Sequence, residues 1–220
     1  MRRRHFLTIT ATGAGGFLVY RLDRSPQRVH AQPRTLKVPL RFFSEAQALA
    51  VAAAAARIFP ADDSGPGAGD AGVVIYIDRQ LAGPYGADRY RYTRAPFLDG
   101  PPELGNQGKA TPREIYREGL KRLEGFADLD EAGQDSRLKE IEAAPFFALL
   151  KRHTIEGMFC DPMHGGNLDK IGWQLIGFPG PRMTYHEEVD QHHGKPLRYP
   201  PLSLGEILGR PVKPVDEDGE

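Results

Sequence analysis

Histidine and acidic residues gather near the C-terminal end of this 220-residue sequence. His186 is followed by two glutamates, Val189 and Asp190, and His192 and His193 come directly afterwards. The pattern is similar to the start of the zinc-binding H-E-x-x-H motif, but Asp190 stands where the second ligand should be. Adjacent histidines also point in different directions. A solvated histidine cluster is therefore favoured over its alternative, a self-contained metal-dependent hydrolase that uses His164, His186, His192 or His193 with nearby aspartates.

The single cysteine, Cys160, is the other candidate for chemistry. Asp161 beside it would raise the pKa of the thiol, and the sequence places no base next to it. A buried small hydrophobe or one half of a bridge to another chain fits better than a nucleophile. The sequence has no G-x-S-x-G, no P-loop and no C-x-x-C-H haem site, and its glycine-rich stretch at 65–69 lies between expected helices. We therefore expect no catalytic, cofactor or metal site in this chain.

The first 31 residues have the form of an export signal. Arg3 and Arg4 begin the twin-arginine pattern RR-x-F-L, a mildly apolar stretch follows from Thr8 to Tyr20, and residues 29–31 form a small-x-small cleavage site. The apolar stretch is shorter than the roughly 20 residues that span a bilayer. We expect residues 1–31 to be a twin-arginine signal peptide, removed after export to the periplasm.

Charge and composition restrict the function of the remaining chain. The full sequence is neutral, and without residues 1–31 it has 23 basic and 28 acidic residues, a net charge of −5. This balance argues against a nucleic-acid partner. With 25 Gly and 19 Pro, much of the chain must be irregular. In an oxidising compartment a single cysteine has no partner within its own chain.

Helix signals dominate the regular part of the sequence. Ser44 is a good N-cap for an Ala-rich helix over Glu45–Phe59, and Thr111 begins a capping box. Further helices are expected to begin at Asp130 and Pro145, and these four should supply the core. The run Val73–Leu81 fits a strand or a helix, and we expect a helix because no second strand is evident to pair with it.

The segments between these helices are rich in Pro and Gly. Residues 60–72 contain several aspartates without the spacing of a calcium loop, so we expect Asp side chains that cap nearby backbone N–H groups. Residues 83–110 should be an ordered excursion. The fold class is thus a mostly α, small irregular helical domain over residues 32–180, with long Pro/Gly-rich loops and an extended Pro-rich C-terminal arm over 181–220. That arm lies over a partner or over its own helices.

The densest part of the sequence is the stretch His153–Gly180, which we call the motif segment. It contains the only Trp (Trp173), the only Cys and a Gly-Gly-Asn turn, so it should pack against a large surface. Glu156 lies near the end of a helix, where the helix dipole disfavours a negative charge. We therefore expect Glu156 to be a structural clamp that accepts backbone N–H bonds from the turn at Gly165, Gly166 and Asn167.

Two stretches resemble a known family. The sequences TIEGMFCDPMHGGNLDKIGWQLIGFPG (154–180) and RIFPADDSGPGAGDAGVVIYIDRQLAG (57–83), with the twin-arginine start, are similar to gluconate 2-dehydrogenase subunit 3. The likeness covers roughly Phe42 to Tyr185. The family positions present in this chain are Glu156, Gly157, Asp161, Pro162, Gly165, Gly166, Asn167, Gly172, Trp173, Gly177, Phe178, Pro179 and Gly180.

The resemblance implies a non-catalytic small subunit that carries no cofactor. Its expected partner is a large FAD-containing dehydrogenase subunit of the glucose-methanol-choline type that oxidises a sugar or polyol. The small subunit would assist maturation and stability of that partner and carry it through the twin-arginine export machinery. A multi-haem cytochrome c subunit commonly completes such complexes and passes electrons to quinone. The implied location is the periplasm, at the inner membrane through the complex.

Two expectations concern the interface with a partner, the first implied by the resemblance and the second by the unpaired cysteine of this sequence. The motif segment should contact the partner through residues such as Glu156, Asp161, Asn167, Trp173 and Phe178, with Trp173 as an aromatic anchor. Cys160 is a candidate for an inter-subunit disulfide, which a non-reducing gel of the complex would test. Besides the hydrolase, the alternative is a solitary exported binding protein, which would purify as a monomer without a flavoprotein.

Overall fold

The computed structural model describes residues 17–22, 34–91, 95–98, 100–104, 108–182, 184, 186, 189 and 200–209, with side chains from residue 38 onward. Arg3, Arg4, the cleavage site, His192 and His193 lie outside this part of the chain. The helical expectation is confirmed, because α-helices and short 3-10 turns provide most of the regular structure. None of the described helices is both long and apolar enough to cross a membrane.

Short turns join some of the elements, and long connections join others, such as the helices that begin at Val73 and Pro112. The longer elements are β1 (Phe17–Leu22), β2 (Arg34–Pro39), α1 (Glu45–Ile58), α2 (Val73–Ala82), α3 (Pro112–Leu120), α4 (Glu131–Glu140), α5 (Pro145–Phe159), α6 (Ile171–Ile176) and α8 (Leu204–Ile207). The 3-10 turns are η1 (Pro102–Leu104), η2 (Lys121–Leu123), η3 (Phe126–Asp128), η4 (Pro162–His164) and η5 (Leu168–Lys170).

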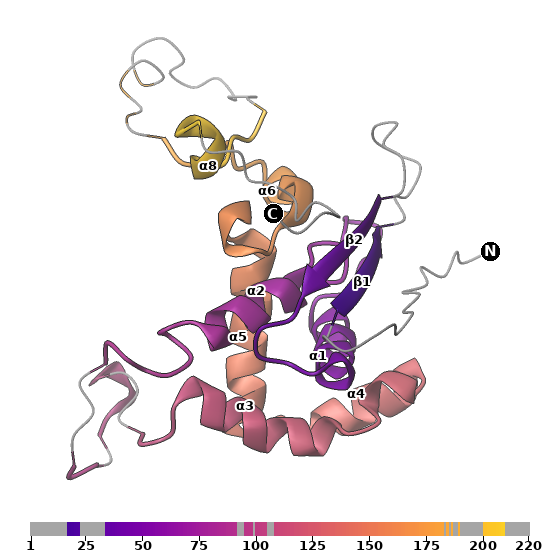
Figure 1. Ribbon diagram of the computed structural model, residues 1–220, viewed down its shortest axis with the longest axis vertical. Helices are drawn as coiled ribbons and strands as arrows, with labels where there is room; N and C mark the ends of the chain where they lie inside the picture. The colour runs from indigo at the N-terminus through magenta and orange to yellow at the C-terminus, as the bar shows by residue number, and fades with distance from the viewer. Residues whose placement is uncertain are drawn as a thin grey trace.

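The helices pack around α5, which runs through the length of the molecule (Figure 1). Helix α2 crosses it, α3 and α4 lie at one end, and α6 and α8 lie at the other. Ser44 and Thr111 form capping boxes with Gln47 and Glu114, as the pattern at Thr111 predicted. The β1–β2 hairpin pairs Phe17 with Pro39 in antiparallel register, and we did not expect its first strand because it lies inside the predicted signal peptide.

The helices α1, α3, α4 and α5 contribute to the core as expected, and α2 lies at its centre together with them. The α2 side chains Val73, Val74, Ile75, Ile77 and Leu81 are all at most 3% exposed. Only Arg79, Gln80 and Ala82 near its C-terminal end are partly exposed, so the helix is surrounded along most of its length. Its run of β-branched residues makes the segment look like a strand in the sequence, but it forms a helix, and the sheet of the described residues contains only β1 and β2.

The loop before α2 behaves as expected for capping aspartates. Asp62 accepts a bond of 2.8 Å from the backbone N–H of Ser64, and Asp70 accepts one of 2.9 Å from Gly67. These local bonds give the aspartates a structural purpose in a glycine-rich turn.

One buried charge on α2 holds the chain that leads into α1. Asp78 is 2% exposed, and its carboxylate accepts backbone N–H bonds of 2.8–2.9 Å from Arg41, Phe42 and Phe43. A buried carboxylate is costly unless its lone pairs are satisfied, and three backbone donors satisfy it here. These hydrogen bonds position Phe43 in the core, where the centre of its ring lies 6.1 Å from the centre of the Tyr116 ring.

We predict that Asp78→Asn destabilises the protein by about 3 kcal/mol, because an amide replaces one accepting oxygen with a donor that faces backbone N–H groups. Equilibrium unfolding in urea measures the change. Asp63→Asn is the matched control, because Asp63 is exposed in the loop and should change stability by less than about 0.5 kcal/mol. Equal effects for the two variants would contradict the role of Asp78.

Candidate functional site

The motif segment is the C-terminal cap of α5. The last carbonyl groups of a helix have no partners within the helix, so other groups must satisfy them. Here the backbone N–H of Asn167 donates to Gly157 O at 2.8 Å, and its side-chain Nδ2 donates to Cys160 O at 2.8 Å. The indole Nε1 of Trp173 donates to Phe159 O at 2.7 Å. Two side chains of the motif therefore complete one helix end.

Asn167 also begins the next helix. It is fully buried with φ 48° and ψ 45°, and its Oδ1 accepts the backbone N–H of Gly172 at 2.8 Å. The left-handed conformation is more accessible to Asn than to most residues. One side chain thus joins the end of α5 to the start of α6.

The glycines of the motif allow this turn to lie directly on α5. A Cβ at Gly166 would lie 2.2 Å from Gly157 O, and one at Gly172 would lie 2.0 Å from Met158 O. No side chain can enter at these distances without moving the backbone. The Gly-Gly-Asn pattern is therefore explained by the close approach of two backbone segments.

Trp173 is an internal pin, which corrects its expected role as an anchor exposed to a partner. It is 3% exposed, and its ring packs edge to face on Phe178 with centroids 5.2 Å apart. A large indole whose one donor is already used inside the chain has little left to offer a partner. The backbone N–H of Phe178 donates to Trp173 O at 2.8 Å, so Phe178 closes the same turn.

Glu156 makes different contacts from those we expected. Its carboxylate accepts a bond of 3.0 Å from the Tyr76 hydroxyl and lies 3.4 Å from Arg152 Nε. The turn at Gly165–Asn167 is held by Asn167 instead. Because Tyr76 is on α2, Glu156 fastens α5 to α2, and the neighbouring arginine compensates its charge near the helix end.

A buried histidine continues this polar contact into the core. His153 is fully buried, with Nδ1 2.9 Å from the Tyr116 hydroxyl and Nε2 2.8 Å from the Tyr85 hydroxyl, to which Arg152 also donates at 2.7 Å. The buried Tyr116 needs an acceptor and finds it at Nδ1, so Nε2 carries the proton and donates to Tyr85. One chain of polar contacts therefore crosses α3, α5 and α2. It consists, in order, of Tyr116, His153, Tyr85, Arg152, Glu156 and Tyr76.

This environment keeps His153 neutral. Burial, assisted by the positive charge of Arg152, lowers its pKa to about 4, and burial raises the pKa of Tyr116 well above its ordinary value. His153 is a residue of α5, whereas Tyr85 and Tyr116 come from distant segments of the chain. The sequence alone therefore does not indicate these hydrogen bonds.

We predict that stability falls as pH decreases from about 6.5 to about 4. In this window the unfolded chain binds a proton on His153 and the folded chain does not, so protonation favours unfolding by up to about 3 kcal/mol. Urea unfolding at several pH values measures the slope. His153→Gln is less stable at neutral pH but should lose this part of the slope. An unchanged slope in that variant would contradict the assignment.

A shallow apolar groove lies beside the motif turn. It has a volume of about 510 Å³ and lies between α2, α5 and η4, lined by Tyr76, Gln80, Ile155, Glu156, Phe159, Cys160 and His164. Ile155 is 45% exposed and the adjacent Met163 is 48% exposed. The groove is therefore built from motif residues near the cap of α5 together with Tyr76 and Gln80 of α2.

Cys160 lies in the wall of this groove. Its thiol is half-buried and lies 3.6 Å from Gly157 O, and burial raises its pKa to about 12. A thiol that resists ionisation is a poor nucleophile and a slow partner in disulfide exchange. This supports its interpretation as a small hydrophobe, and the inter-subunit disulfide stays a prediction.

The described part of the C-terminal arm packs on the motif of its own chain. Asp161 Oδ1 accepts the N–H of Met163 at 3.0 Å, while its Oδ2 accepts that of Leu204 at 2.6 Å. Lys170 pairs with Glu206 at 2.7 Å. At Gly180, with φ 95°, a Cβ would lie 2.0 Å from Leu202 O. Residues 200–209 are thus fastened to the motif segment. This part of the arm lies on its own chain, which is one of the two alternatives that we considered.

The remaining motif residues lie at the ends of the short helices. Pro162 begins η4, which Gly165 ends with φ 98°, and Gly177 ends α6 with φ 68°. Among the described residues no three His, Cys, Asp or Glu side chains gather as a metal site would require. His164 is exposed and lines the groove, whereas His186 is not one of the residues that line it.

These features define a small helical protein with an apolar groove beside a rigid turn. A family model described as gluconate 2-dehydrogenase subunit 3 matches residues 45–180, which cover the elements from α1 to α6. The chain therefore belongs to that family and is a subunit of a dehydrogenase complex. No curated protein and no solved structure matches it significantly.

We predict that Asn167→Ala costs about 3 kcal/mol, because it removes two buried hydrogen bonds and places a Cβ residue without a polar side chain at positive φ. Asn167→Gly removes the same bonds, but glycine adopts a positive φ without strain, so this variant should be about 1 kcal/mol more stable than Asn167→Ala. Urea unfolding of both variants measures these differences. The account fails if both variants keep wild-type stability.

Proposed function

We propose that this chain is the non-catalytic small subunit of a periplasmic, membrane-associated FAD-dependent sugar or polyol dehydrogenase of the glucose-methanol-choline type. It binds the large flavin subunit, assists its maturation and stability, and takes it through the twin-arginine route. FAD is held by that partner, and a multi-haem cytochrome c subunit receives the electrons. The observation that carries the proposal is the family match over residues 45–180, which includes the whole motif turn.

The groove beside the motif turn is the best candidate for the contact with the flavin subunit. It is apolar, it is built from α2 and α5, and its shape is fixed by the cap of α5. Exposed apolar side chains that lie next to a rigid polar frame are typical of protein interfaces. Ile155 and Met163 would enter the partner, while Glu156 and His164 would lie at the rim of the contact.

A second set of exposed apolar side chains extends this surface toward α8. Ile176 is 58% exposed on α6, and Leu202, Ile207 and Leu208 are 44–59% exposed on the segment fastened to the motif. Figure 1 places α6 and α8 at the same end of the molecule. A partner that covers the groove and this end would bury both sets at once.

We predict that the tagged full chain, purified from its native periplasm, carries with it a large subunit with the visible absorbance of oxidised flavin. Absorbance of the eluate and a denaturing gel measure this directly. A colourless single band from a strain that expresses the dehydrogenase would contradict the proposal and favour the solitary binding protein.

The same capture tests the groove. Ile155→Glu puts a charge into the apolar contact and should reduce the captured flavin at least tenfold, since burial of an unpaired charge costs more than 1.4 kcal/mol. Because Ile155 is exposed in the free chain, the variant should keep its unfolding midpoint. Lys139→Glu on α4 is the control, as an exposed charge change on another helix. Equal capture by both variants would exclude the groove as the interface.

A further inference from the structure

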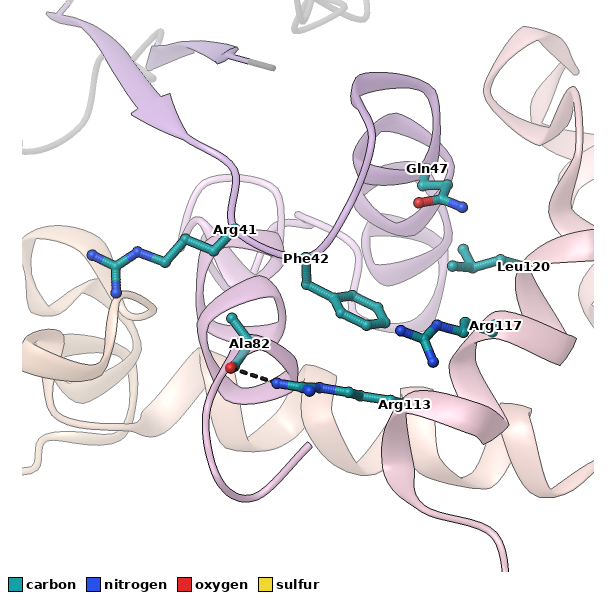
Figure 2. Close-up of a pocket in the computed structure, with 7 residues that line it drawn as sticks. All are labelled: Arg41, Phe42, Gln47, Ala82, Arg113, Arg117 and Leu120. Carbon is teal, nitrogen blue, oxygen red and sulfur yellow. Dashed lines mark hydrogen bonds between the residues drawn. The ribbon is translucent and has the colours of Figure 1, made fainter. Parts of the chain in front are cut away.

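A second pocket, away from the motif groove, presents nitrogen donors. It has a volume of about 320 Å³ and lies where the segment before α1 meets α2 and α3 (Figure 2). We call it the basic pocket, lined by Arg41, Phe42, Gln47, Arg113, Arg117 and Leu120 together with Ala82. Figure 2 shows the guanidinium groups of Arg113 and Arg117 beside the Phe42 ring, while Arg41 points away from them.

The two arginines come from one helix turn and carry the same charge. Arg113 and Arg117 are four residues apart on α3, a spacing that brings side chains together and makes like charges repel. Glu118 pairs with Lys121, and Glu114 accepts hydrogen bonds from Thr111 while also lying near enough to Arg117 to interact with its charge. Within the described part of the chain no ion pair reaches either arginine.

The donors of these side chains are only partly used. Arg113 donates from Nε to Leu81 O at 2.5 Å and from Nη2 to Ala82 O at 2.5 Å and Gly83 O at 3.3 Å, which fixes its position. Among the described residues its Nη1 makes no hydrogen bond. Arg117 lies with its guanidinium carbon 5.7 Å from the centre of the Phe42 ring. Gln47 uses its side-chain oxygen as an acceptor for the N–H of Ser44, so its Nε2 is the group left to donate.

We propose that the basic pocket binds an organic carboxylate with a short carbon stem. The guanidinium groups supply charge-assisted hydrogen bonds of the kind that carboxylates accept. Phe42, Leu120 and Ala82 supply an apolar wall for the methylene groups next to the carboxylate. An inorganic oxyanion would use the donors and leave this wall without a contact. The carboxylate belongs either to a small organic acid or to an acidic side chain of the flavin subunit.

The first experiment uses the isolated full chain and does not depend on the proposed function. Butyrate is titrated at constant ionic strength, with sulfate in a parallel series, and arginine Nε–H and backbone amide signals are followed by NMR. A small-acid site gives saturable shifts at Phe42 and Arg117 with butyrate, weaker with sulfate. Arg117→Gln should weaken binding at least tenfold, while Arg122→Gln, the matched control beyond α3, should leave it unchanged.

The second experiment identifies a carboxylate on the partner. Arg117→Glu is used in the flavin capture assay: if the carboxylate belongs to the partner, this variant should reduce the captured flavin at least tenfold, and Arg122→Gln should not. Saturable butyrate binding with normal capture assigns the pocket to a free organic acid, and loss of capture without butyrate binding assigns it to the partner. No butyrate binding together with normal capture by Arg117→Glu would overturn the proposal. A wild-type chain that captures no flavoprotein would affect only the proposed function.

Discussion

The end of helix α5 is the constraint on which the motif depends. A helix that ends inside a protein must find partners for its last carbonyl groups, and this one obtains them from Asn167 and Trp173. Asn167 is suited to the task because it adopts the left-handed conformation, is fully buried and bonds on both sides of the turn. The close backbone approach then restricts the neighbouring positions to glycine. The motif residues thus serve first to cap α5 and to let the turn pack closely against it.

This close packing has consequences for the surface of the molecule. With its backbone fixed, the turn presents Met163 and His164 beside Ile155, and Asp161 fastens residues 200–209 to the same end. The most distinctive side chain of the segment, Trp173, is used inside the chain. On the proposed function, a partner would therefore contact the exposed neighbours of the motif and not Trp173. The residues that fold the motif and the residues that it exposes are therefore largely different ones.

Local features of the fold could be predicted from the sequence. The caps at Ser44 and Thr111 depend on residues three positions apart, and the mostly helical class follows from several such signals. The groove could not be predicted, because Tyr76 and Glu156 are 80 residues apart and meet only when α2 crosses α5. The same holds for Asp78, whose partners lie 35–37 residues earlier in the chain. The roles expected for Glu156 and Trp173 were wrong because residue type indicates hydrogen-bonding capacity but not the partner.

Hydrogen–deuterium exchange of the chain, free and bound to its flavin subunit, tests the central claim most directly. The free chain should already protect the amides of Asn167 and Gly172, because the cap of α5 forms without a partner. The complex should add protection around Ile155 and Met163. Rapid exchange at Asn167 in the free chain, or no change along the groove on binding, would contradict the view that a preformed motif turn presents the interface.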